Sequence, residues 1–151
     1  MKIPYKALLA LCLILAAGPS YALCTAGTTS VNFGAYDVFQ TAQTNSTGSI
    51  TITCDKTTNN VVVNIGTSSY SGVFSPRQME KAGASELLNY KLFTDPARLN
   101  VWGDGTLGTS NFTGQVRKNF PAILIVYGSI PAGQDVSAGL YSDVLTVTVL
   151  P

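Results

Sequence analysis

The end of the chain restricts the fold most strongly, because it has the pattern of a β-strand with no sequence after it. Leu145, Val147 and Val149 alternate with threonines, which is the two-residue period of a strand buried on one face. A strand inside a sheet needs a neighbour on each edge, or some protection for a free edge. The sequence stops at Pro151, so we expect the edge of this last strand to need a partner from elsewhere.

The beginning of the chain has the features of a secretory signal peptide. Two lysines precede an apolar run over residues 7–17, and a small-x-small cleavage site ends at Ala22. The run is well short of the roughly 20 apolar residues that a membrane-spanning helix needs. We therefore predict a signal peptide over residues 1–22, export across the inner membrane, and no transmembrane segment in the mature chain.

The mature chain, residues 23–151, has the size of one domain. Lipidation of Cys24 is disfavoured because Leu23 precedes it, where a lipidation signal would want a small residue. Removing the two lysines of the signal leaves seven basic side chains against eight acidic ones. Only Arg117 and Lys118 are adjacent, so no basic patch forms, and nucleic acid and anionic membranes are poor candidate partners.

Two cysteines remain after the signal is removed, Cys24 and Cys54. In an exported chain, such a pair predicts one disulfide. Closing a loop of about 30 residues should stabilise the fold by roughly 3–4 kcal/mol. A redox or metal-binding role is the weaker alternative, because neither cysteine lies in a CxxC motif and two ligands do not complete a zinc site.

The rest of the mature chain reads as short strands separated by turns, with no convincing helical period. The expected strands cover residues 28–33, 49–54, 61–65, 87–93, 122–127 and 144–150. Polar or glycine-rich connections are expected over residues 35–47, 66–83 and 103–114. This arrangement predicts an all-β sandwich.

The sequence offers no recognisable active site. It contains no histidine, which excludes the usual Ser-His-Asp and Cys-His nucleophile systems and imidazole metal sites. The acidic residues stand mostly alone in predicted turns, where aspartate caps backbone amides. We expect no catalytic residue, no cofactor and no bound metal, and we predict that the protein is not an enzyme.

A binding surface is harder to exclude. Two loops carry apolar side chains that could form one contact patch if both loops reach the same end of the sandwich. These candidate contact residues are Tyr36, Phe39, Tyr70, Val73 and Phe74. The alternative, that they fold back as satellite core, is at least as strong. Trp102 could stack on a sugar, but a lone tryptophan is more often part of the core.

Several segments, in this order, resemble the spore coat protein U domain family, which includes spore coat proteins and subunits of archaic chaperone–usher pili. Besides the two cysteines, the matching segments are Phe33-Gly34, Gly48–Cys54, Arg77–Met79, Leu88–Phe93, Trp102–Gly105, Gly128–Gln134, Gly139–Asp143 and Leu145–Val149. The order of these segments, rather than any single one, carries the resemblance, which covers nearly the whole mature chain.

The resemblance implies an immunoglobulin-like β-sandwich that lacks its last strand. In pilus subunits of this kind a periplasmic chaperone fills the gap first, and the N-terminal extension of a neighbouring subunit replaces it at the outer-membrane usher. The row formed by Leu145, Val147 and Val149 would then flank the acceptor groove. The implied partners are the chaperone, the usher and a neighbouring subunit that donates a strand.

One feature departs from the family pattern. A polymerising pilin carries a donor segment of roughly a dozen alternating residues before its first cysteine, whereas here only Leu23 lies between the predicted cleavage site and Cys24. We therefore expect a subunit that accepts a strand without donating one. This would suit a terminal, tip-like position, a coat protein that does not polymerise, or a separated first domain of a longer tip protein.

Two functions from different classes follow from the sequence. The first is an exported structural or adhesive subunit of a chaperone–usher pilus or coat, which passes through the periplasm to the cell surface or an extracellular coat. The alternative is a self-sufficient secreted domain that binds a carbohydrate or a protein. Travel with a periplasmic chaperone would favour the first, and a stable monomer without any chaperone would favour the second.

Overall fold

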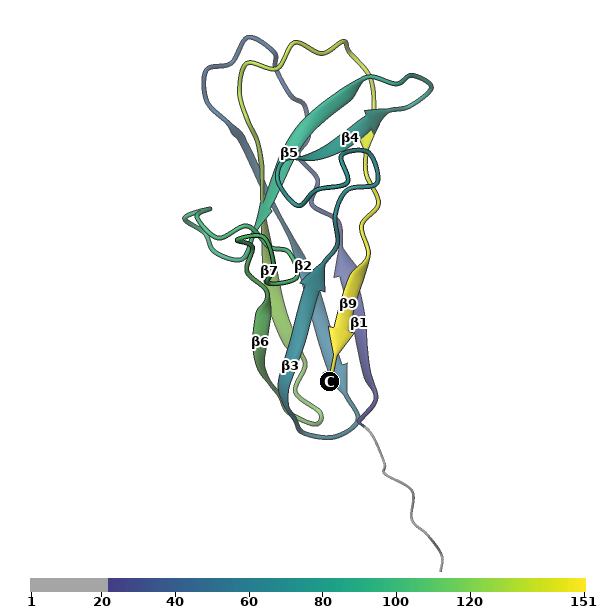
Figure 1. Ribbon diagram of the computed structural model, residues 1–151, viewed down its shortest axis with the longest axis vertical. Coiled ribbons are helices and arrows are strands. Elements are labelled where there is room, and N and C mark those ends of the chain that lie inside the picture. The colour runs from purple at the N-terminus through teal and green to yellow at the C-terminus, as the bar shows by residue number, and fades with distance from the viewer. Residues whose placement is uncertain (1–21) are drawn as a thin grey trace, which may run out of the picture.

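A computed structural model describes residues 22–151, and the chain in this range is all-β (Figure 1). The strands are β1 (Cys24–Thr29), β2 (Thr44–Cys54), β3 (Thr58–Ile65), β4 (Arg77–Lys81), β5 (Leu87–Phe93), β6 (Phe112–Val116), β7 (Ala122–Ile130), β8 (Tyr141–Ser142) and β9 (Val147–Leu150). The predicted signal peptide, apart from Ala22, lies outside the described residues. Within them, no helix is long and apolar enough to cross a membrane.

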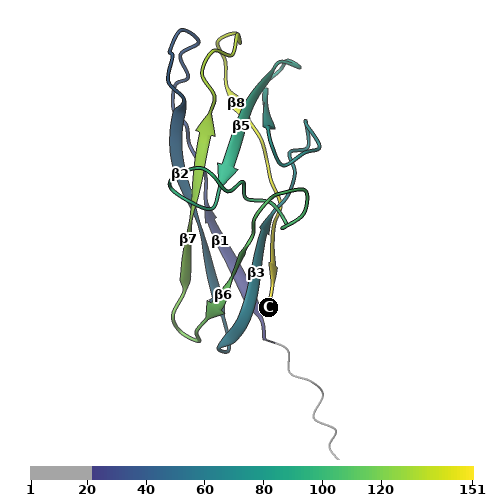
Figure 2. The same ribbon diagram turned by 60° about the vertical axis from the view of Figure 1, so that its left-hand side comes forward.

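The strands form two sheets that pack as an elongated sandwich (Figures 1 and 2). The larger sheet has the strand order β1-β2-β7-β5-β4-β8, and the smaller one has the order β6-β3-β9. The pairings between these strands are all antiparallel. The prediction of an all-β sandwich is confirmed, and the two terminal strands β1 and β9 fall in different sheets.

The core follows the two-residue alternation expected from the sequence. Ile50 and Ile52 of β2 are buried, as are Val61 and Val63 of β3. Trp102 is also a core residue, because only 2% of its surface is exposed and its indole N–H donates to the Val63 carbonyl over 3.0 Å. Burial removes apolar surface from water, which is the main force that holds the two sheets together.

The first strand begins earlier than expected. It covers Cys24–Thr29 rather than residues 28–33, because Cys24 lies directly opposite Cys54 in the pairing of β1 with β2. The second strand also begins earlier, at Thr44, because its polar first half pairs with the end of β7. The last strand begins later than expected, at Val147. Pairing in the sheet, which the local pattern does not report, sets these boundaries.

Three strands were missed in segments that we expected to be irregular, and one of them, the two-residue β8, lies between the expected strands at residues 122–127 and 144–150. β4 lies within the predicted loop over residues 66–83, and β6 begins inside the predicted connection over residues 103–114. The inward side chains of β4 are Arg77 and Met79, so a charged residue occupies a core position and hides the apolar alternation. β6 is short and contains Gly114, which weakens a strand pattern.

Gly48 allows the close approach of the chain that leaves β1. A Cβ atom at this position would lie 2.6 Å from the Thr29 carbonyl oxygen and 3.0 Å from the Val31 nitrogen. We predict that Gly48→Ala lowers the free energy of unfolding by about 2 kcal/mol, because backbone must move to make room. Gly27→Ala is the matched control, since nothing lies within 4 Å of a Cβ there. Urea unfolding of both variants checks the difference, and equal midpoints would contradict it.

Candidate functional site

The candidate site is the seam between β1 and β9. In the larger sheet β1 pairs only with β2, from Cys24↔Cys54 to Thr29↔Ser49. In the smaller sheet β9 pairs only with β3, from Ile65↔Val147 to Val62↔Leu150. The two strands lie side by side (Figure 1), yet no pairing joins them within residues 22–151. Each therefore presents one row of backbone donors and acceptors without a strand partner.

The side chains expected to flank a groove line this seam. Leu145, Val147 and Val149 are half-buried and pack against the core, whereas Thr146 and Thr148 face solvent. Leu145 precedes β9 rather than lying within it. Here the chain is fastened by a hydrogen bond from the Gly66 N–H to the Thr146 carbonyl, over 2.9 Å. The apolar row thus faces the interior beside an unpaired strand edge.

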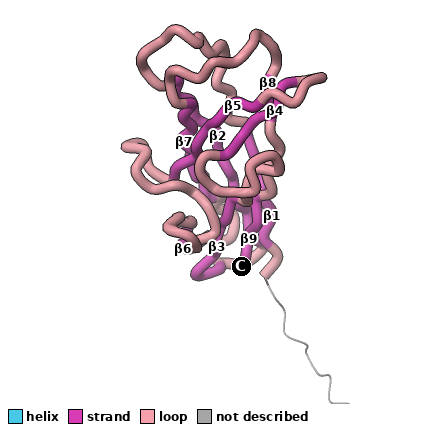
Figure 3. The backbone as a smooth tube through the Cα atoms, turned by 45° about the horizontal axis from the view of Figure 1, so that its top comes forward, coloured by secondary structure: helices cyan, strands magenta, loops and turns pink. Residues whose placement is uncertain are grey.

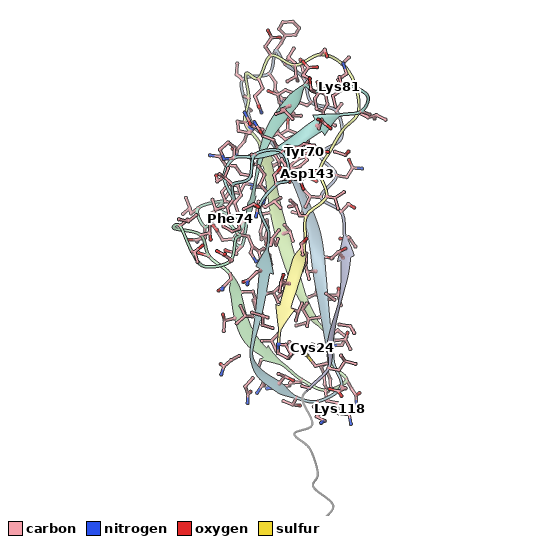
Figure 4. The ribbon with its side chains drawn as sticks, turned by 45° about the vertical axis from the view of Figure 1, so that its right-hand side comes forward. Cys24, Tyr70, Phe74, Lys81, Lys118 and Asp143 are labelled. Atoms are coloured by element: carbon pink, nitrogen blue, oxygen red, sulfur yellow. A yellow bond between two sulfur atoms is a disulfide. The ribbon has the colours of Figure 1, made fainter. Side chains whose placement is uncertain are left out.

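The opposite wall of the seam is held by the disulfide. Cys24 and Cys54 are joined in the structure, which confirms the predicted pairing. Beyond Cys24, β1 is exposed along its length, so its attachment depends on the ladder to β2 and on this covalent link. Figure 4 places Cys24 near the lower end of the sandwich.

Beyond β1 the seam widens into a cleft of about 740 Å³. One wall is the segment of residues 30–38, and the other is the segment of residues 136–143, which leads towards β9. Met79, Leu88 and Ile130 also line the cleft, and all three are buried core residues. Both walls belong to the loops at the end of the sandwich remote from the C-terminus (Figure 3). The cleft and the seam are therefore bordered by the same first and last parts of the mature chain.

Tyr36 ties the first wall of this cleft to the connection that follows β7. Its hydroxyl donates to the Pro131 carbonyl over 3.1 Å and accepts from the Gln134 N–H over 2.9 Å. Nearby, Phe33 packs edge-on against Tyr90, with ring centroids 6.1 Å apart. These contacts fix the position of the chain between β1 and β2.

The other candidate contact residues do not gather into one patch. Phe39 is 90% exposed in the loop before β2, and that loop reaches the end of the sandwich remote from the C-terminus (Figure 1). Tyr70 and Val73, at 42% and 45% exposed, lie in the loop between β3 and β4, which sits lower on the molecule (Figures 1 and 2). Phe74 packs near the Arg77 guanidinium, 5.7 Å from its ring centroid. The two loops therefore lie at different heights of the sandwich (Figures 1 and 2), and a binding role for these residues stays a prediction.

Tyr70 instead lies close to Asp143 (Figure 4), which belongs to the wall of the cleft. Partial burial raises the pKa of Tyr70, and the negative charges of Glu80 and Asp143 raise it further. Asp143 also accepts a hydrogen bond from the Tyr90 hydroxyl over 2.6 Å, and burial together with this bond raises the pKa of Tyr90. From the sequence, neither residue is assigned a role in a site. Asp143 is a lone aspartate, which is typical of a turn, and Tyr90 lies in an expected strand.

A second polar cluster ties the other end of this wall to the β4–β5 turn. The Glu86 carboxylate accepts from the Ser137 N–H over 2.7 Å, from the Tyr141 hydroxyl over 2.8 Å, and from the Ser137 hydroxyl. Lys81 lies 3.7 Å from the same carboxylate, near the upper end of the molecule (Figure 4). The hydrogen bonds from Ser137 and Tyr141, with the charge of Lys81, lower the pKa of Glu86 to about 2.

This lowered pKa makes the cleft wall acid-sensitive. A carboxylate whose pKa is lower in the folded chain stabilises the fold above its ordinary pKa of 4.5, and that contribution is lost as the pH falls towards about 2. We predict that residues 136–141 lose protection from amide exchange between about pH 5 and pH 2. In Glu86→Gln this loss should be present already at neutral pH and should change little with pH. Asp135→Asn, exposed on the same connection, is the control and should titrate like the parent chain.

Three comparisons bear on what this chain is similar to. The family model described as the Spore Coat Protein U domain matches residues 11–148. Protein U of Myxococcus xanthus is 33% identical over 135 residues, which cover 82% of this chain and 73% of that protein.

A solved structure shows the same fold. The CsuC–CsuE chaperone–tip adhesion subunit pre-assembly complex, from archaic chaperone–usher Csu pili of Acinetobacter baumannii, matches with a TM-score of 0.59 and 21% identity. That match covers 85% of this chain but only 39% of the other. The minor tip subunit HdaB of the E. coli Hda pilus matches with a TM-score of 0.41 and 17% identity, over 83% of this chain and 79% of that one. The sandwich is of the immunoglobulin-like type.

Proposed function

The chain belongs to the Spore Coat Protein U domain family, whose members are structural and adhesive proteins rather than enzymes, and on that premise we propose that it is an exported subunit of a chaperone–usher pilus or coat. It accepts a β-strand from another polypeptide along the seam between β1 and β9. Its route is through the periplasm to the cell surface or to an extracellular coat.

One observation carries this proposal: two strands that border the same gap each lack a neighbour on the facing edge. An added strand could hydrogen-bond to the free backbone of β9 and place alternate side chains on the core beside Val147 and Val149. Such pairing draws its affinity from the main chain and its specificity from side-chain pockets. The cleft of about 740 Å³ beyond β1 extends the space available to such a strand.

The proposed partners are a periplasmic chaperone, an outer-membrane usher and a neighbouring subunit that supplies the strand. The CsuC–CsuE complex is a chaperone bound to a tip subunit before assembly, and the shared fold makes a chaperone the first partner to seek. Co-purification from the periplasm is the direct search. A chaperone that travels with the chain would support the proposal.

A terminal, tip-like position is part of the proposal. Cleavage after Ala22, as the sequence predicts, would leave Leu23 as the residue before Cys24. Leu23 is already engaged, because its N–H donates to the Asp55 carboxylate over 2.9 Å and its carbonyl accepts from the Asp55 N–H over 3.0 Å. A mature chain of this kind has no free segment ahead of β1 to donate. N-terminal sequencing of the exported protein tests this, and a longer mature N-terminus would contradict it.

The strand-accepting seam is tested by supplying the strand in the same chain. A Gly-rich turn after Pro151 would lead into a segment of roughly six residues in which valine and threonine alternate. The control fusion has the same composition with the alternation shifted by one residue, which turns every valine away from the core. We predict that the fusion whose valines face the core is more stable than the control fusion by about 2 kcal/mol, because the buried valines remove apolar surface from water.

Urea unfolding of both fusions and of the parent chain measures this difference. Equal stability of the two fusions, together with a parent chain that is a stable monomer without a chaperone, would overturn the proposal. The self-sufficient secreted binding domain would then be the better description.

A further inference from the structure

A second pair of unpartnered strand edges lies on the other side of the smaller sheet. β5 pairs with β7 only at Tyr127–Ser129, so residues 122–126 of β7 have a neighbour, β2, on one edge alone. β6 pairs only with β3. Within the described chain, β6 and β7 are connected by the turn at residues 117–121 but do not form a ladder with each other. In the order β6-β3-β9, this gap and the β1–β9 seam lie at opposite edges.

The gap between β6 and β7 is a groove and not a filled core. Its volume is about 400 Å³, and Figure 2 shows the two strands facing each other beside it. The lining residues are Thr94, Trp102, Asn111, Phe112, Thr113, Ile123, Leu124, Ile125 and Tyr127. None of them is charged, so a charged occupant would lose its hydration without gaining an opposite charge.

The free edge of β7 lacks the usual protection. Natural edge strands carry charges, bulges or prolines that discourage pairing with other chains. Here Ile123 and Ile125, at alternate positions, are 65% and 41% exposed, and no charged residue lies in β7. Phe120, just before the strand, is 71% exposed. An uncharged strand edge with exposed apolar side chains is a surface for pairing with another strand.

We propose that this groove binds an extended, uncharged segment of another polypeptide, paired with residues 122–126 of β7. Alternate apolar side chains of the segment cover Leu124 and Phe112 on the inner side of the groove. Its intervening side chains lie beside Ile123 and Ile125. This lateral site is separate from the β1–β9 seam and does not depend on it.

The test uses the oxidised mature chain, residues 23–151, and an acetylated and amidated peptide of roughly seven alternating valine and threonine residues. Amide exchange resolved by residue, by NMR, reports where the peptide pairs. We expect slower exchange, on addition of peptide, at those amides of residues 122–126 that point away from β2. In the double variant Ile123→Lys, Ile125→Lys, binding at this edge should weaken by about tenfold or more, because lysine blunts an edge strand. Leu107→Lys, at a residue 90% exposed in another loop, is the matched control and should bind like the parent.

The outcomes separate the two sites. Protection only at residues 147–150 would overturn the lateral site and leave the proposed function standing. Protection only at residues 122–126 would support the lateral site and count against strand acceptance at β9. Protection at residues 122–126 that grows with protein concentration in the absence of peptide would mean that a second copy of this chain pairs there, which would overturn the occupant proposed above.

Discussion

Replacing Arg77 with methionine is expected to lower the free energy of unfolding by about 4 kcal/mol. Arg77 is fully buried, and its guanidinium donates to the carbonyls of Ile65, Gly66, Phe74 and Trp102 over 2.7–3.1 Å. Methionine keeps an unbranched apolar stem but donates no hydrogen bond. The four carbonyls would lose these bonds in a place that water does not readily reach.

Two further variants make this result interpretable. Burial lowers the pKa of Arg77, while the nearby Tyr90 and Asp143 oppose the shift, so the guanidinium is held mainly by its hydrogen bonds. Arg77→Lys should fall between the parent and Arg77→Met, because a single ammonium cannot reproduce the planar fork of donors. Arg117→Met removes an exposed guanidinium that donates a hydrogen bond to the Gln115 side chain, and this substitution should lower the free energy of unfolding little. A urea midpoint for Arg77→Met close to that of Arg117→Met would show that the buried network contributes nothing.

In the proposed function, Arg77 acts by holding the wall of the acceptor groove in place. Its hydrogen bonds hold the end of β3 to the loop that carries Tyr70 and Phe74, and Tyr70 lies beside Asp143 on the wall of the cleft. Loss of Arg77 should therefore loosen the wall of the proposed acceptor groove as well as the core. Amide exchange across residues 66–76 would reveal this loosening.

Replacing Cys24 with serine is expected to lower the free energy of unfolding by about 3 kcal/mol, and little folded protein should remain in the periplasm. The disulfide joins directly opposite residues of β1 and β2 and closes a chain separation of 30 residues. Without it, β1 is an exposed strand at the edge of the sheet, held by one ladder. Since β1 forms one side of the seam, strand acceptance should weaken together with stability.

The double variant Cys24→Ser, Cys54→Ser removes the free thiol that the single variant leaves, and it should be destabilised to a similar extent. Thr25→Ser, in the same strand and exposed, is the matched control and should keep the parent yield. Periplasmic yield and resistance to protease measure both variants. An undiminished yield of resistant Cys24→Ser protein would contradict the role given to the disulfide.

The regular parts of the sandwich were predictable because side-chain alternation reports which face of a strand is buried. Residues 87–93 were predicted as a strand and form β5. Residues 49–54 were predicted as a strand and lie within β2, where Ile50 and Ile52 are both buried. The disulfide was predictable because Cys24 and Cys54 are the two cysteines that follow the predicted signal peptide, which leaves one possible pairing.

The missed features share a physical cause. The local pattern of β4 is hidden because Arg77 occupies a core position, and a buried arginine is stable only where carbonyls from distant segments converge on it. The polar start of β2 reads as a loop, but it pairs with the end of β7. The loops of residues 35–47 and 66–83 could form one contact patch only if both reached the same end of the sandwich. Where each loop lies along the sandwich depends on the packing of the whole domain, which the loop sequences do not report.

The sequence by itself determined that this chain is an all-β domain with one disulfide and with an alternating strand at its end. Only the tertiary structure decided which strands became neighbours, and so which edges stayed without one. The reason is that a period of two tells which face of a strand meets the core, whereas the partner along each edge depends on backbone groups that every residue carries alike. The open edges of β1, β9, β6 and β7 are therefore properties of the assembled sandwich, and on them both proposed binding sites rest.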